Sequence, residues 1–272
     1  MEVELEISPF YISLLAGAAA GTSTDLSFFP IDTIKTRLQA KGGFFANGGF
    51  KGLYRGLGPA VLASAPSAAL FFVTYDTAKT KFKNNGTNDH LSHMMAASMG
   101  EIAACLARVP AEVLKQRTQS LQFNSGMEAF RAILNNKSGE GILKGLYRGW
   151  GSTIMRDIPF TMIQFPLYEQ LKKWLVKAGA DNELLKGALC GSVAGSISAA
   201  LTTPLDVLKT RLMLSKENIS IIKLTKTLYI EEGPKVFLTG IGPRTMWIGA
   251  GGAIFLGVYE TVKGFLNSTG FA

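Results

Sequence analysis

The sequence predicts an all-α membrane protein with six transmembrane helices arranged in three repeats. Three observations predict this fold: one motif occurs three times, apolar stretches of about 20 residues flank each copy, and charged residues are scarce. Only 18% of the 272 residues are charged, against about 25% in average soluble proteins, and the mean hydropathy is +0.20. Together these features favour a bilayer rather than water around the chain.

The repeated motif consists of proline, any residue, an acid, two residues, lysine, one residue and arginine. It reads PIDTIKTR from Pro30, PAEVLKQR from Pro110 and PLDVLKTR from Pro204, at intervals of 80 and 94 residues. A second motif of tyrosine, acid, two residues and lysine follows each copy, as YDTAK, YEQLK and YETVK. Such recurrence indicates internal repeats. We expect the repeats near residues 1–85, 86–180 and 181–272.

Two apolar segments belong to each repeat. Each is close to the length that crosses a bilayer and carries at most two charged residues. We therefore expect six transmembrane helices with both chain ends on one side. The segments are Ile12–Pro30, Leu57–Thr74, Leu91–Pro110, Gly149–Tyr168, Gly187–Leu205 and Gly240–Tyr259.

The alternative is a large soluble protein with apolar core helices, and two features oppose it. Glycines recur at four-residue spacing, as at Gly17 and Gly21, which suits close helix packing in lipid. The connections after the first, third and fifth segments hold 17 Lys and Arg, against 8 on the opposite side. This bias indicates membrane topology. It also opposes a nucleic-acid patch, despite the net charge of +8.

Other residues exclude several function classes. Cys105 and Cys190 are too few for a disulfide framework, and we expect both to be small buried residues. No base precedes Lys35, so any organelle address is expected to be internal. His90 and His93 lie at the start of the third segment and are expected to precede its helix and to be solvated. Because no Gly-rich nucleotide motif or His/Cys metal cluster is present, we expect no enzyme, no cofactor and no metal site.

The threefold motif, with Tyr-acid-x-x-Lys closing each repeat, resembles that of the mitochondrial carrier family. The resemblance covers essentially the whole chain. It implies a multi-pass inner-membrane protein whose six tilted helices surround a central cavity with pseudo-threefold symmetry, and it implies solute exchange. We also expect a monomer that binds cardiolipin. Repeat three departs from the pattern, with Leu238-Thr239-Gly240 in place of an aromatic-base-glycine triplet and Met213 in place of a glutamine.

The opening motif is expected to form a gate on the matrix side. A proline inside a helix bends it, so three kinked helices can converge at one end. The alternative is ion pairing within each helix at three-residue spacing, which contributes only about 0.2–0.5 kcal/mol. The ring would contain Asp32, Lys35, Glu112, Lys115, Asp206 and Lys209, with Gln39 and Gln119 hydrogen-bonded beneath it.

The closing motif is expected to form a second gate on the cytoplasmic side. Its acids and lysines would pair between helices when the matrix side is open, and its tyrosines would brace them. Opening either gate costs free energy that substrate binding must offset, which explains strict exchange. The ring would contain Asp76, Lys79, Glu169, Lys172, Glu260 and Lys263, with Tyr75, Tyr168 and Tyr259.

Charged residues that break the threefold symmetry are candidates for solute contact, because ionisable groups inside a membrane are usually functional. Arg156 and Asp157 form an adjacent pair without charged counterparts in the other repeats. Arg156 can bind a carboxylate bidentately and Asp157 an ammonium, which suits an α-amino acid. Alternatively, the two neutralise each other or serve neighbouring helices. Asp25 and Glu101 add negative charge, and Arg108 opposes it if it faces inward.

Four stretches resemble the family members that carry S-adenosylmethionine: DTIKTRLQ, GEIAACLARVPAEVLKQR, RDIPFTMIQFPLYE and TTPLDVLKTRL. In this interpretation Arg156 and Asp157 hold the zwitterion, Asp25 or Glu101 stabilises the sulfonium, and adenine stacks on Trp247 or Phe160. The exchanged solute would be S-adenosylhomocysteine, which lacks the sulfonium charge. The alternatives are a carrier of arginine, lysine or ornithine, a membrane enzyme that consumes the cofactor, and a structural or proton-conducting family member.

Overall fold

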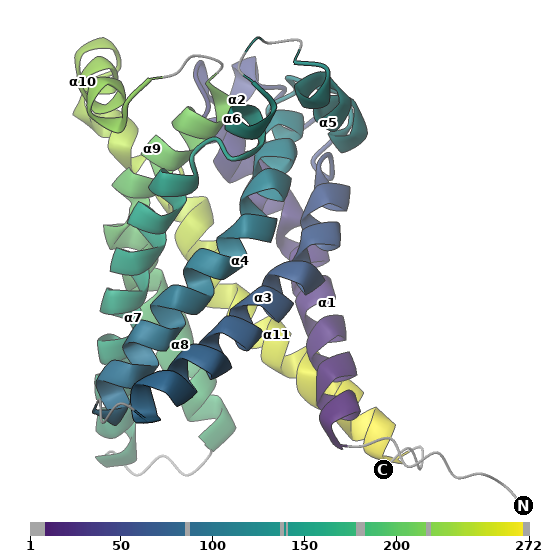
Figure 1. Cartoon of the computed structure of the whole chain (residues 1–272), viewed down its shortest axis with the longest axis vertical. Coiled ribbons are helices and arrows are strands. Elements are labelled where there is room, and N and C mark those ends of the chain that lie inside the picture. The colour runs from purple at the N-terminus through teal and green to yellow at the C-terminus, as the bar shows by residue number, and fades with distance from the viewer. Residues whose placement is uncertain are drawn as a thin grey trace, which may run out of the picture. The chain divides into compact units, whose positions relative to one another are not determined.

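The computed structural model describes residues 9–84, 88–136, 139, 141–177, 183–215 and 219–268 (Figure 1). Every regular element in these ranges is a helix, which confirms the all-α prediction. In chain order the elements are α1 (Pro9–Gln39), α2 (Gly43–Ala46), α3 (Leu57–Asn84), α4 (Asp89–Gln119), α5 (Gly126–Leu134), α6 (Ile142–Leu146), α7 (Trp150–Lys177), α8 (Glu183–Leu201), α9 (Thr203–Leu214), α10 (Ile221–Glu231), the 3-10 helix η1 (Pro234–Leu238) and α11 (Ile241–Ser268).

The three motif prolines act differently on their helices. Pro30 and Pro110 lie inside α1 and α4, which are continuous helices of 31 residues each. In contrast, α8 ends at Leu201 and α9 begins at Thr203, so Pro204 lies in the first turn of a new helix. A proline is tolerated there because the first backbone N–H groups of a helix have no partner within it. The fifth apolar segment is therefore two helices rather than one kinked helix.

Hydropathy alone supports fewer membrane spans than the repeat pattern predicts. Within the described residues, α3 is long and apolar enough to cross a bilayer, and α8 with α9 meets the same requirement as one broken span. Charged residues interrupt two of the other predicted membrane-spanning helices: Glu101 and Arg108 lie in α4, and Arg156 and Asp157 lie in α7. Six spans thus remain a prediction that rests on the repeats.

Contacts between Cα atoms divide the chain into two compact units. The first contains residues 1–32, 162–200 and 242–272, and the second contains residues 33–161 and 201–241. Each unit draws residues from all three predicted repeats, because the division cuts through α1 and α7. The limits of the three repeats stay a prediction.

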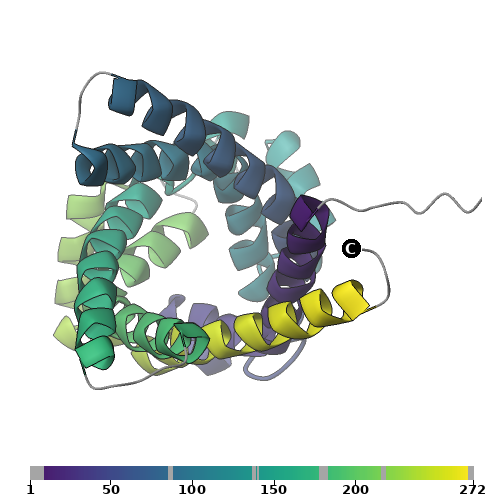
Figure 2. The ribbon, with the colours of Figure 1, turned by 90° about the horizontal axis from the view of Figure 1, so that it is seen from below.

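In the second unit, α3 and α4 lie side by side along much of their length (Figures 1 and 2). A buried cluster joins α4, α5 and α9 through Val109, Val113, Ile133 and Met213. A second buried cluster joins α9, α10 and η1 through Leu208, Leu224, Leu228 and Val236. These contacts pack the carboxyl-terminal half of α4 against α9, and the polar site is built on those two helices, α7 and the end of α1.

In the first unit, α8 packs closely against α11. A side chain at Gly195 would collide with Ile248, since a Cβ atom there would lie 2.7 Å from the Ile248 Cγ2. Ser196 donates a hydrogen bond to the carbonyl oxygen of Thr245 at 3.3 Å. The small residues of α8 therefore permit the close helix contact that their four-residue spacing predicts.

Candidate functional site

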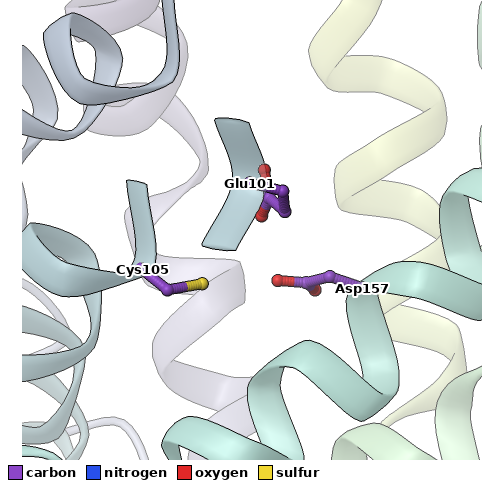
Figure 3. A group of neighbouring side chains, drawn as sticks. All are labelled: Glu101, Cys105 and Asp157. Atoms are coloured by element: carbon purple, nitrogen blue, oxygen red, sulfur yellow. The ribbon is translucent and has the colours of Figure 1, made fainter. Parts of the chain in front are cut away.

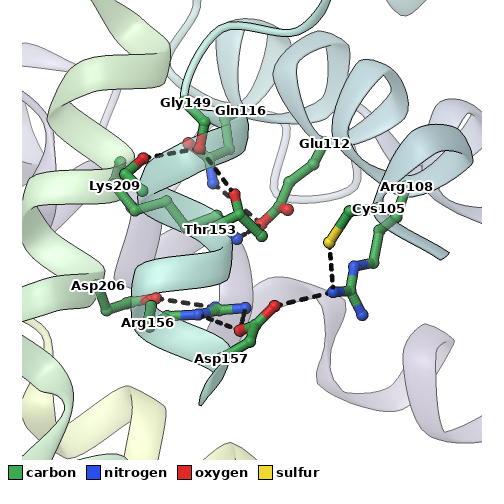
Figure 4. A network of polar contacts seen from close by, with 12 residues as sticks. Cys105, Arg108, Glu112, Gln116, Gly149, Thr153, Arg156, Asp157, Asp206 and Lys209 are labelled. Carbon is green, nitrogen blue, oxygen red and sulfur yellow. Dashed lines mark hydrogen bonds and ion pairs between the residues drawn. The ribbon is translucent and has the colours of Figure 1, made fainter. Parts of the chain in front are cut away.

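A series of ion pairs with alternating charge links α4, α7, α9 and the end of α1 in the second unit. Figure 4 shows its central part, from Arg108 through Asp157 and Arg156 to Asp206. Arg156 is its centre: its Nε donates to the Asp157 Oδ1 at 2.6 Å and its NH1 to the Asp206 Oδ1 at 3.1 Å. We call the whole series the charged network. Its members are Glu101, Arg108, Asp157, Arg156, Asp206 and Lys35.

The charged network brings together residues that the sequence assigns to two different tasks. Arg156 and Asp157 are predicted substrate contacts, whereas Asp206 is a predicted gate acid. Arg156 and Asp157 pair with each other and also with neighbouring helices, which is the arrangement of the alternative interpretation. These bonds occupy the same side-chain atoms that a bound zwitterion would need, so a ligand of this kind must replace them.

Burial makes these ion pairs strong and costly to break. Asp157 is 8% exposed and Asp206 is 1% exposed. Opposite charges attract more strongly in such surroundings than in water, and removing one partner leaves a buried charge uncompensated. The side chain of Arg108 is the most open in the pairs it forms, at 35% exposure.

Glu101, Cys105 and Asp157 point toward one another from α4 and α7 (Figure 3). Their oxygen and sulfur atoms all lie within 4.8 Å, a spacing that can suit a metal ion. Arg108 reaches all three, however: its NH2 donates to the Asp157 Oδ2 at 2.8 Å, to the Cys105 Sγ at 3.3 Å and to Glu101. The guanidinium of Arg108 thus supplies the positive charge that the two carboxylates need, and we interpret the cluster as a binding site for this side chain rather than for a metal ion.

Two ion pairs of the predicted matrix gate are present. Lys35 Nζ lies 2.8 Å from Asp206 Oδ2, and Lys209 Nζ lies 2.5 Å from Glu112 Oε1. Both pairs connect residues of different repeats, so they differ from the pairing within one helix. The third predicted pair joins Asp32 of the first unit to Lys115 of the second, and it stays a prediction.

The two predicted gate glutamines make different contacts. Gln39 donates to the Asp206 Oδ2 at 2.9 Å and accepts from the Thr210 hydroxyl at 2.7 Å, so it lies against the Lys35–Asp206 pair. Gln119 donates to the Thr33 hydroxyl at 3.1 Å and accepts from the Thr36 hydroxyl at 3.0 Å. Both glutamines are fully buried and link helices of different repeats.

The predicted cytoplasmic gate is only partly within the described side chains. Tyr75 and Lys79 lie in α3, with the Lys79 Nζ 5.7 Å from the Tyr75 ring centre. The Tyr75 hydroxyl lies 2.6 Å from the Nδ1 of His93. His93 was expected before the third helix, but α4 already begins at Asp89 and places it within hydrogen-bonding distance of Tyr75.

The other members of this gate remain predictions. Asp76 belongs to the second unit, while Tyr168, Glu169 and Lys172 belong to the first. The side chains of Tyr259, Glu260 and Lys263 lie outside the described residues.

Two predicted substrate contacts belong to a different unit from the charged network. Asp25 and Trp247 belong to the first unit, whereas Glu101, Arg156 and Asp157 belong to the second. A shared binding pocket for all five therefore stays a prediction.

Arg108 is a site residue whose position the sequence interpretation left open. It follows Glu101 by seven residues and Cys105 by three, and residues at these spacings share one face of a helix. This signal was available in the sequence and places Arg108 on the side of Glu101.

The motif arginines form a second group to which the sequence interpretation gave no role. Arg37 donates from Nε to the Gln119 carbonyl oxygen at 2.8 Å and from NH1 to that of Gly49 at 2.5 Å. Arg117 donates to the Met213 carbonyl oxygen at 3.3 Å, and Arg211 pairs with Glu232 at 2.6 Å. Arg37 and Arg117 each bind the backbone of the next repeat, which is a structural role. The recurrence of arginine at one motif position is the signal in the sequence for this role.

We expect Arg37→Ala to destabilise the protein, because Arg37 is fully buried and its loss leaves backbone carbonyl groups unsatisfied. Each such group costs about 1–3 kcal/mol, so the midpoint of thermal unfolding in detergent should fall by about 5 °C or more. Arg131→Ala in α5 is the matched control, since Arg131 is exposed. Equal midpoints for both variants would show that the Arg37 bonds contribute little.

Comparison with known proteins agrees with these features. A sequence model described as "Mitochondrial carrier protein" matches residues 7–47, 43–86, 87–179 and 180–270. The chain is 60% identical over 275 residues to the "Putative mitochondrial carrier protein PET8" of Saccharomyces cerevisiae, covering 97% of both chains.

Two further relatives have names that specify a solute. The chain is 48% identical to the "S-adenosylmethionine mitochondrial carrier protein homolog" of Drosophila melanogaster, over 96% of this chain and 94% of the relative. It is 44% identical to the "Mitochondrial S-adenosylmethionine carrier protein" of Mus musculus, over 96% and 97% of the two chains.

Proposed function

The chain belongs to the mitochondrial carrier family, whose members are transporters, and from this premise we propose that it exchanges S-adenosylmethionine for S-adenosylhomocysteine by alternating access. Relatives named for S-adenosylmethionine at 44–48% identity support this solute. The observation that carries the proposal is the Arg156–Asp157 pair, which offers a guanidinium and a carboxylate side by side. Both solutes present the matching carboxylate and ammonium.

In the proposed mechanism, solute binding weakens the gate through Arg156. The guanidinium is bonded to Asp206, which is also the partner of Lys35. A solute carboxylate that binds Arg156 competes with Asp206 and removes one link between α7 and α9. Because the solute interacts more strongly with one state than with the other, it can shift the equilibrium between them. An empty carrier would keep this link and interconvert slowly.

We propose further that the protein is a monomer that crosses the mitochondrial inner membrane six times and binds cardiolipin. The surface of α3 supports a lipid environment, since Leu62, Phe72 and Val73 are each more than 60% exposed. Large apolar side chains in such numbers on one long helix favour contact with lipid rather than water.

An exchange assay in proteoliposomes tests the proposed function. Vesicles that contain the purified chain and internal S-adenosylmethionine should take up labelled S-adenosylmethionine, and external S-adenosylhomocysteine should compete. Arginine, lysine and ornithine should not compete, and the label should be recovered chemically unchanged. Competition by arginine without competition by S-adenosylmethionine would identify a carrier of basic amino acids, and a modified product would identify an enzyme.

A further inference from the structure

Arg108 holds two acidic side chains that would otherwise repel each other. Its NH2 contacts Glu101 on α4 and lies 2.8 Å from the Asp157 Oδ2 on α7. The ligand atoms of these two carboxylates and of Cys105 lie within 4.8 Å of one another. At that separation two negative charges repel strongly in a partly buried site. Arg156 already pairs with Asp157, and Arg108 adds the positive charge that lies between Asp157 and Glu101.

We propose that Arg108 is a resident counterion, which occupies the cation-binding position of the empty carrier and is displaced by the sulfonium of the solute. The inference rests on the proposed function, because it assigns Glu101 to the sulfonium of S-adenosylmethionine and leaves Asp157 to its ammonium. It makes Arg108 a determinant of specificity. The guanidinium repels positive charge on the solute, so it lowers the affinity more for a solute that carries more positive charge.

The few hydrogen bonds that hold the Arg108 side chain are consistent with a group that a solute can displace. Its contacts with Glu101, Cys105 and Asp157 all converge on one terminal nitrogen, and its Nε is buried without a hydrogen-bond partner. Arg37 differs, since it is fully buried and donates from Nε, NH1 and NH2 to three carbonyl groups. The side chain of Arg108 is also 35% exposed, so it has room to move while its acidic partners stay in place.

The two proposed solutes separate the effect of this charge from all other contacts. Both carry the amino-acid zwitterion and the adenosine, and only S-adenosylmethionine carries the sulfonium. Removal of the Arg108 charge should therefore favour S-adenosylmethionine over S-adenosylhomocysteine. A purely structural role of Arg108 would instead change the affinity for both solutes in the same proportion.

The test measures dissociation constants of both solutes for the purified full chain by titration calorimetry. The quantity compared is the dissociation constant of S-adenosylhomocysteine divided by that of S-adenosylmethionine. In Arg108→Gln this ratio should rise about tenfold, because a positive charge that repels the sulfonium is removed. The matched control is Arg131→Gln, which removes the same charge from an exposed position on α5 and should leave the ratio unchanged.

A second variant tests the inference if Arg108→Gln does not fold. In Glu101→Gln the same ratio should fall about tenfold, because the carboxylate that faces the sulfonium is lost while Arg108 keeps Asp157. The double variant Glu101→Gln/Arg108→Gln restores the charge balance and should return close to the wild-type ratio. If the wild-type chain binds both solutes and a folded variant keeps the wild-type ratio, this inference alone is overturned. A wild-type chain that binds neither solute overturns the proposed function and this inference together.

Discussion

Arg156→Ala is expected to weaken the binding of S-adenosylmethionine strongly and to slow its exchange. The guanidinium is the proposed partner of the solute carboxylate, and in the structure it is bonded to Asp157 and Asp206. Truncating one member of a buried charge pair costs about 2–5 kcal/mol, which corresponds to a loss of affinity of about 30- to 5,000-fold. Titration calorimetry and initial exchange rates in proteoliposomes measure the two effects separately.

Arg156→Lys and Arg131→Ala distinguish the interpretations of such a loss. The lysine variant keeps the positive charge but cannot bind a carboxylate in the bidentate way, so we expect intermediate affinity. Arg131 is exposed on α5, and its removal should have no effect. Undiminished solute binding by a folded Arg156→Ala variant would assign Arg156 to structure, or the chain to a structural or proton-conducting member of the family.

The sequence predicts the fold well where its repeats carry the information. The apolar segments beside the threefold motif indicate where the long helices lie. However, α1, α3, α4, α7 and α11 all continue beyond the carboxyl-terminal ends of the predicted segments. The break at Thr202 was not predicted, because Pro204 stands in the same motif position as Pro30 and Pro110. Whether a helix continues through a proline depends on the packing around it.

The sequence predicts the residues of the candidate site better than their partners. Departure from threefold symmetry was enough to select Arg156, Asp157 and Glu101. The bond from Arg156 to Asp206 was not predictable, since it joins residues 50 positions apart whose approach depends on the packing of α7 and α9. The position of Arg108 was predictable from helical spacing, whereas its contact with Asp157 on another helix was not.

Lys35→Asp is expected to disable the matrix gate. It would place a second carboxylate beside Asp206, which is 1% exposed and whose Oδ2 lies 2.8 Å from the Lys35 Nζ. Breaking a buried ion pair costs about 3–5 kcal/mol, so the closed form of this gate should lose at least a hundredfold in population. Exchange in proteoliposomes should become slow or uncoupled, with labelled solute leaving vesicles that have no exchange partner outside.

The swapped variant Lys35→Asp/Asp206→Lys should recover this loss only in part. Reversal restores an ion pair between α1 and α9, but the new lysine at position 206 faces Arg156, whose NH1 lies 3.1 Å from Asp206 in the native protein. Lys51→Asp is the matched control, because it makes the same substitution at an exposed lysine between α2 and α3. Normal coupled exchange by Lys35→Asp would contradict the gate, whereas full recovery in the swapped variant would contradict the link from Arg156 to it. Partial recovery is expected only if Asp206 serves Lys35 and Arg156 at once, which is the arrangement that would let a solute bound at Arg156 open the gate.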